Sequence, residues 1–186
     1  TNTFFDNLVN EKILAIEMGY GFRSKRFSLN SNGYLTRWEN RPLPYGLSVP
    51  DPLDPSEFIR VNVPGMDAIH MGIETDFAVI LHKKLSLEGM VSIGDWRWAS
   101  KEDIVIYSDT ISFDARGVHV GDAAQSTYAA RLRYAFVKNG YLKLKYTFFD
   151  RYYSDFNPNS LSGETSGKDS WRIPSYGLLS IHAGYT

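Results

Sequence analysis

The sequence predicts an all-β protein, an antiparallel up-and-down meander of about seven strands that forms part of the wall of a transmembrane β-barrel. Three observations lead to this prediction: runs in which apolar and polar residues alternate, connections that are alternately short and long, and aromatic residues at both ends of the runs. Alternation with a period of two is typical of a strand that has one face in an apolar medium.

The hairpin over Ser126–Tyr153 shows the alternation most plainly. Along both of its runs, leucine, tyrosine and phenylalanine alternate with arginine, lysine and threonine. Asn139 and Gly140 accept the positive φ that tight reversals need, so we place the turn there. The remaining strands are expected over Leu14–Phe22, Phe27–Asn40, Ala68–Ile80, Leu85–Trp98 and Tyr176–Tyr185.

The connections between these runs have, in order, 4, 27, 4, 27, 4 and 22 residues. Every second connection of a meander lies at the same end of the sheet, so the short turns and the long loops are expected at opposite ends, as in outer-membrane barrels. The first long connection, Arg41–Asp67, holds six prolines and is expected to form no sheet. In the second, Ile104–Phe113 is expected to form a small hairpin around Asp109 and Thr110.

Composition excludes several classes of protein. The 20 basic and 21 acidic residues nearly balance, which gives no support to a nucleic-acid partner. The absence of cysteine excludes a disulfide scaffold and a thiolate metal site. No run reaches the length of about 18 apolar residues that a membrane-spanning helix needs. Aromatic residues make up 15%, and such residues collect at binding surfaces and at membrane–water interfaces.

The polar face of the expected strands carries a set of charged residues that we expect to face a barrel lumen. These are Glu17, His70, Glu74, Asp76, Arg131, Arg133, Lys143 and Lys145. The spacing of the histidine and the two acids on one strand would allow a metal site, but a lumen-facing row explains it equally simply, and no metal is predicted. The four basic residues could bind an anionic ligand, although pairing with acidic groups nearby is the simpler interpretation.

Nothing in the sequence predicts catalysis or a cofactor. Ser126 or Ser180 could be combined with His182, but no Ser/His/Asp spacing, nucleophile elbow or phosphate loop is present. The alternative fold is a soluble β-sandwich or lipocalin-like barrel, which would act as a ligand- or carbohydrate-binding or adhesion module. That fold explains the alternating residues but not loops of 22 to 27 residues, which are uncommon in compact domains.

Two stretches resemble a known family. The segment Asp6–Tyr34 resembles a barrel segment of the TonB-dependent outer-membrane receptors, and Gly117–Phe156 resembles barrels of that family from Bacteroidetes-type bacteria. The matching positions of the first segment are Asn7, Leu8, Glu11, Glu17 and Gly19, and Asn10 stands where the family usually has proline.

The resemblance implies a barrel of about 22 strands closed by a plug. Residues 1–186 would then be a single segment of that barrel, its C-terminal part, without the plug and the remaining strands. Such receptors lie in the outer membrane of Gram-negative bacteria, contact its lipid, and take up scarce nutrients (siderophore-bound iron, cobalamin or glycans) with energy from the TonB complex, reached through the plug. A small molecule or metal chelate would be the ligand. We expect it to contact loop residues, namely Tyr45, Arg60, Tyr107, Arg116, His119 and Trp171.

Overall fold

The computed structural model describes residues 9–41, 47–51, 53–61, 65–106, 109–121, 123–156, 161 and 163–185. Its main sheet has eight strands in the order β1-β2-β5-β6-β9-β10, after which both β11 and β12 pair with β10. The strands of this sheet are β1 (Lys12–Arg23), β2 (Phe27–Asn40), β5 (Gly65–His82), β6 (Leu85–Trp98), β9 (Ala124–Val137), β10 (Gly140–Tyr153), β11 (Arg172–Ile173) and β12 (Tyr176–Tyr185).

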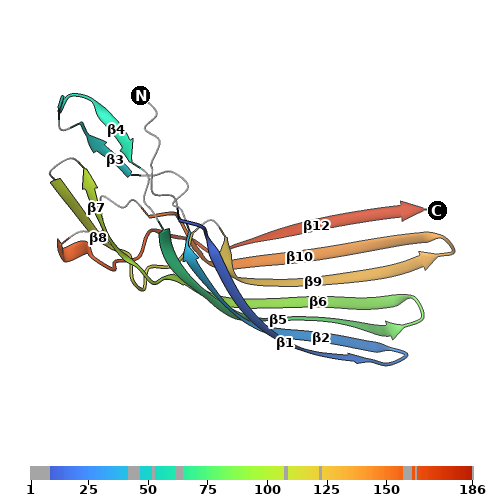
Figure 1. Cartoon of the computed structure of the whole chain (residues 1–186). Helices are drawn as coiled ribbons and strands as arrows, with labels where there is room; N and C mark the ends of the chain where they lie inside the picture. The colour runs from blue at the N-terminus through green and yellow to red at the C-terminus, as the bar shows by residue number, and fades with distance from the viewer. Residues whose placement is uncertain are drawn as a thin grey trace.

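Seven long strands of this sheet follow one another in chain order, and each pairs antiparallel with the next. The sheet is twisted and open, and its outer strands are β1 and β12 (Figure 1). The short turns gather at one end and the long loops at the other (Figure 1). The predicted fold class, an antiparallel meander that forms a partial barrel wall, is confirmed.

Pairing across the sheet separates an apolar face from a polar face. One row of paired residues consists of Phe27, Val79, Leu87, Leu132, Leu144 and Ile181, in neighbouring strands from β2 to β12. One residue along each strand, the paired row is Ser28, Ala78, Glu88, Arg131, Lys145 and Ser180. Because side chains alternate between faces, these two rows identify the apolar and the polar face of the whole sheet.

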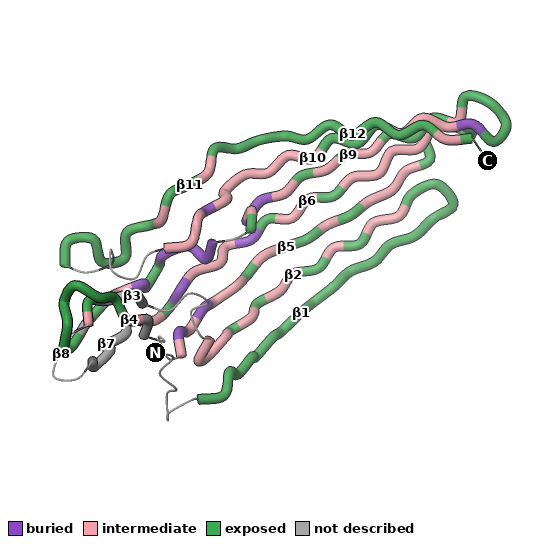
Figure 2. The backbone as a smooth tube through the Cα atoms, turned by 90° about the horizontal axis from the view of Figure 1, so that it is seen from above, coloured by how far each residue is buried: buried purple, intermediate pink, exposed green. Residues whose placement is uncertain are grey.

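The apolar face has no second layer over it in the described part of the chain. Met18 is 81% exposed, and Ile16 and Ile181 are 65% and 64% exposed. Exposed and half-buried residues run along all the long strands (Figure 2). A sheet buried in a sandwich would cover these side chains, so their exposure over the full width of the sheet is the main physical feature of the fold.

The short turns are tighter than the sequence predicts. The structure leaves Ser24–Arg26, Lys83–Lys84 and Lys138–Asn139 between the strands, because the strands extend further into each turn. Asn139 has a φ of 67°, which is the positive value expected at the third turn. The Ser24 hydroxyl donates to the Phe27 carbonyl at 3.1 Å and closes the first turn.

The proline-rich connection corrects one prediction. Within it, β3 (Leu47–Pro50) pairs antiparallel with β4 (Phe58–Val61), although no sheet was expected there. Pro50 occupies the last position of β3, where a missing N–H costs little because the ribbon ends. Between the strands, Asp51 and Asp54 accept backbone N–H groups at 2.8 and 3.0 Å, which builds the reversal.

The small hairpin predicted in the second long connection is present, with a shifted turn. It consists of β7 (Lys101–Ile106) and β8 (Asp109–Asp114). Asp109 pairs with Ile106 and Thr110 with Val105, so both residues lie inside β8 and the reversal precedes them. Both small hairpins project from the loop end of the sheet (Figure 1).

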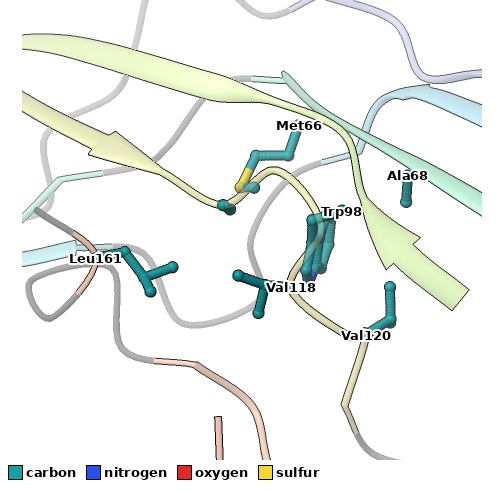
Figure 3. Packing of buried hydrophobic residues seen from close by; sticks show 7 residues of the cluster. Met66, Ala68, Trp98, Val118, Val120 and Leu161 are labelled. Atoms are coloured by element: carbon teal, nitrogen blue, oxygen red, sulfur yellow. The ribbon is translucent and has the colours of Figure 1, made fainter. Parts of the chain in front are cut away.

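The fully buried apolar residues form one cluster at the loop end. Its members are Met66, Ala68, Trp98, Ala115, Val118, Val120 and Leu161 (Figure 3). Strands β5 and β6 supply the first three, and the two later loops supply the others. Burying one such large side chain contributes about 1.5–3 kcal/mol, so this cluster holds the loops against the sheet.

The loop over residues 115–120 extends the pairing of β6 beyond the start of β9. Trp98 N–H donates to the Val118 carbonyl at 2.9 Å, and Val120 N–H donates to the Trp96 carbonyl at 2.9 Å. The loop thereby satisfies backbone groups that would otherwise be buried without partners. Gly163–Thr165 forms a short 3-10 turn, and no described helix has the length and apolar character needed to cross a membrane.

Candidate ligand-binding face and loop mouth

The polar face brings together all eight residues that the sequence places on one side of the strands. Register puts the acidic residues Glu17, Glu74 and Asp76 on β1 and β5, and the four basic residues on β9 and β10. His70 lies on the same face of β5, nearer the loops. That this face lines a lumen remains a prediction.

Polar partners on neighbouring strands satisfy several of these charges. Arg131 on β9 forms an ion pair with Glu88 on β6. Asn30 donates a hydrogen bond to Asp76 at 3.0 Å, and Ser92 donates to Glu74 at 3.3 Å. On β10, the ammonium of Lys143 lies 4.7 Å from the ring centroid of Tyr141. The face is therefore a polar lattice in which side chains tie neighbouring strands together, and Arg133 and Lys143 both lie over the ring of Tyr141.

An aromatic cluster occupies the polar face where the strands meet the loops. The ring of His70 stacks on Trp96 with centroids 5.4 Å apart, and Trp38 lies 6.1 Å from His70 on the other side. The indole N–H of Trp96 donates to the Tyr34 hydroxyl at 2.9 Å. Arg41 lies over Trp38 at 5.2 Å from its centroid. Flat rings with polar edges at the entrance to a polar face are suited to stacking on a ligand ring.

Two buried polar atoms of this region have no hydrogen-bond partner, namely Nε2 of His70 and Nε1 of Trp98. The sequence alone does not identify this cluster as a site, because aromatic residues at the ends of the runs are also expected at a membrane–water interface. The pattern that identifies it is parity: Trp38, His70 and Trp96 all fall on the polar side of their strands.

The structure describes the six predicted ligand contacts to different extents. Tyr45 and Tyr107 lie outside the described residues, and for Arg60 the structure describes only the backbone, in β4. Arg116 is exposed and binds Asp114 through both ends of its guanidinium, at 2.9 and 2.6 Å. These hydrogen bonds lower the pKa of the Asp114 carboxyl to about 2. Arg116 is therefore already paired within its own loop.

His119 is only 6% exposed and is held from several sides. Its Nδ1 lies 2.9 Å from Asp169 Oδ1, and its Nε2 lies 3.5 Å from Asp95 Oδ1. The ring also stacks on Tyr153 with centroids 4.0 Å apart. This geometry joins the second and third long loops to β6 and β10, and leaves His119 little surface for a ligand.

Trp171 is 66% exposed and lines a loop cavity of about 330 Å³. Asp155, Lys168 and Asp169 line the same cavity, so its wall carries two carboxylates and one ammonium group beside the indole. Of the six predicted contacts, Trp171 is the described residue whose position best fits contact with a ligand. The three predicted contacts with described side chains all lie at the loop end.

No group of three or more metal-ligating side chains occurs in the described ranges. Along β5 three residues separate His70 from Glu74 and one separates Glu74 from Asp76. Side chains on β2 and β6 engage the two carboxylates. The chemistry that this face supports is hydrogen bonding, ion pairing and ring stacking.

An open antiparallel meander with an exposed apolar face and a polar opposite face defines the class of the chain: part of the wall of a transmembrane-type β-barrel. No protein-family model matches the chain, and no curated protein matches its sequence. Among solved structures it is similar to "Copper transporter OprC", with a TM-score of 0.63 and 13% identity over 97% of this chain. The chain spans 24% of that structure's length. At 13% sequence identity, this likeness shows a shared fold and nothing more.

Proposed function

We propose that the chain is part of the barrel wall and extracellular loops of a TonB-dependent outer-membrane transporter that takes up a scarce nutrient. The observation that carries the proposal is the apolar face, which is exposed and continuous across six to seven strands. The solved structure to which the chain is similar in fold is a copper transporter, which supports the same class of function. We infer no catalytic role.

The long loops and the aromatic cluster would form the surface that first meets the ligand. His70 and Trp96 present stacked rings at the entrance to the polar face, and the Tyr34 hydroxyl accepts a hydrogen bond from Trp96. Trp171 adds an exposed indole in the loops. Siderophores, cobalamin and glycans all offer rings and polar groups that such residues can stack on and hydrogen-bond to. The proposed ligand is therefore a small molecule or metal chelate of one of these classes.

A soluble sandwich is disfavoured by the arrangement of the described layers. Such a fold would pack a second sheet on Ile16, Leu144 and Ile181, whereas the two small sheets of the structure lie at the loop end (Figure 1). The two hypotheses differ in what covers the apolar face, and that contact is measurable.

The test is a cysteine scan of β10 in the full-length protein in membranes, with a spin label that reports lipid contact. Labels at Leu142, Leu144, Tyr146 and Phe148 are expected to contact lipid. Their matched neighbours, Lys143, Lys145 and Thr147, serve as controls and are expected to contact water. These 186 residues contain no cysteine, and any native cysteine elsewhere in the full-length protein is first replaced by serine so that each label is unambiguous. Labels on both faces that report a protein interior or bulk water would refute the proposal.

A further inference from the structure

The short-turn end of the sheet is strongly basic. Segments 22–27, 81–85 and 137–141 contain six lysines and arginines and no acidic residue. These six residues, which we name the basic rim, are Arg23, Lys25, Arg26, Lys83, Lys84 and Lys138. The whole chain has a net charge of −1 and the rim contributes +6, so the remaining residues carry −7. The molecule is electrically polarised along its strands.

Backbone hydrogen bonds hold the three turns in a fixed row. The Ile80 N–H donates to the Arg26 carbonyl at 2.8 Å, which ties the first turn to the second hairpin. The Ala135 N–H donates to the Lys84 carbonyl at 2.8 Å, which ties the second turn to the third. The turns are too short to fold back over the sheet, and they lie together at one end of the strands (Figure 1).

The rim cations are available to a partner. All six are exposed, and none of the ion pairs found among the described residues includes them. A concentration of unneutralised like charges costs energy through mutual repulsion unless anions approach them. The row therefore fits a partner that presents many negative charges along a line or plane.

Exposed aromatic residues on the apolar face mark the level at which the rim lies. Phe22, Phe27, Tyr134 and Phe136 are between 36% and 47% exposed and come directly before or after the turns. Aromatic side chains of membrane proteins gather at the level of the lipid headgroups. Lysine and arginine beside them extend their charged ends into the same layer.

We propose that the basic rim binds the phosphate groups of anionic phospholipids in the leaflet at the short-turn end. The inference rests on the proposed membrane-spanning function. A planar array of phosphates matches the row of turns in both charge and position, and the flanking aromatics would contact the adjacent acyl region. An acidic protein could satisfy the charge, but it would give no reason for the exposed aromatic rings beside the first and third turns.

The test compares lipid selectivity in bilayers of phosphatidylcholine mixed with phosphatidylglycerol, using the full-length protein. A spin-labelled form of each lipid reports how much of it is held at the protein surface. The native protein is expected to hold phosphatidylglycerol several-fold more strongly than phosphatidylcholine, and added salt should reduce this preference.

The variant K25Q/K83Q/K138Q removes one cation from each turn and is expected to lose most of the preference. The matched variant K12Q/K101Q/K168Q removes three lysines outside the rim and is expected to keep it. The proposal is overturned if the native protein shows no preference, if the turn variant keeps it, or if both variants lose it equally. A label at Leu144 in the same bilayers separates the hypotheses: lipid contact there without phosphatidylglycerol preference refutes the rim alone, whereas no lipid contact refutes the membrane assignment.

Discussion

Both ring nitrogens of His119 face carboxylates, and this makes the side chain the joint between two loops and the sheet. Asp169 belongs to the last long loop, Asp95 to β6, and Tyr153, on which the imidazole stacks, to β10. Asp95 in turn pairs with Arg97 at 3.0 Å. Such partly buried networks are stabilising when each member has a partner, and sensitive to the loss of any one.

We predict that His119→Ala loosens the loops without unfolding the strands. The change leaves Asp169 without its ring partner and opens a gap over Tyr153, at a cost of about 1–3 kcal/mol. Hydrogen exchange should accelerate over residues 115–121 and 163–171 and stay unchanged in the strands. His82→Ala, at the exposed end of β5, is the matched control and should change neither segment. Equal exchange in both variants would contradict the role given to His119.

At the residue scale, the sequence predicts the face of a side chain better than its partners. All eight charged residues assigned to one side lie there, because register follows from alternation. The use of His119 as a structural joint depends on Asp169, which is 50 residues further along the chain, and no local pattern reveals that pairing. The aromatic cluster has members from three strands. The alternation places its rings on one face, but no local pattern brings them together.

At the scale of a single hairpin, glycine makes room for the rings of the aromatic cluster. A Cβ on Gly72 would lie 2.6 Å from the Ile93 carbonyl oxygen and 2.5 Å from the Tyr34 hydroxyl. A Cβ on Gly33, on the opposite face, would have its nearest atom at 3.9 Å. The backbones of β5 and β6 therefore approach each other where Tyr34 crosses them.

We predict that Gly72→Ala destabilises the protein and that Gly33→Ala does not. The new methyl at Gly72 must displace backbone atoms of β6, which costs about 1–3 kcal/mol, as other forced overpacking does. The measurement is the urea midpoint of unfolding in detergent for the two variants side by side. A midpoint for Gly72→Ala that equals that of Gly33→Ala would show that the strands can separate freely here.

Among the elements, the long strands were predictable and the small hairpins were not fully so. Strands with one apolar face carry their period in the sequence, and their boundaries are within a few residues of the prediction. β3 and β4 are four residues each and hold prolines nearby, so turn chemistry and breakers obscure them. The short β11 depends on Tyr152 and Tyr153 as pairing partners, which no local pattern shows.

At the scale of the whole molecule, the sheet ends in two outer strands with unpaired edges. β1 and β12 each pair on one side in the described structure. Exposed edges of long strands are ready to pair with other chains. In the proposed full-length barrel, neighbouring strands would occupy both edges.

We predict that the isolated chain of 186 residues self-associates in detergent micelles through these edges. Light scattering should give a mass that rises with protein concentration, while the full-length protein stays at one mass. Ala15→Cys in β1 mixed with Ser180→Cys in β12 should form disulfides between chains, and Ala129→Cys in β9 should form none. A monomer at every concentration would show that the edges are closed in some other way.

The architecture as a whole could be predicted because loop lengths and alternation describe a meander without any long-range information. The position of the buried cluster could not. Apolar side chains along the middle of the strands face outward, whereas the buried cluster of the described residues lies at the loop end, where the loops pack on Met66, Ala68 and Trp98 of β5 and β6.

The loop-end cluster of Met66, Trp98, Val118 and Leu161 has a consequence for how the outer surface can change over time. At the tip of the β3–β4 hairpin Leu53 is 79% exposed, whereas Ile59, nearer the base, packs against the cluster. Residues at the β3–β4 tip can therefore be exchanged, lengthened or replaced by a foreign epitope while the anchored base keeps its shape. In the proposed outer-membrane transporter, such a surface could vary under immune or phage pressure at this tip and keep the ligand entrance constant beneath it.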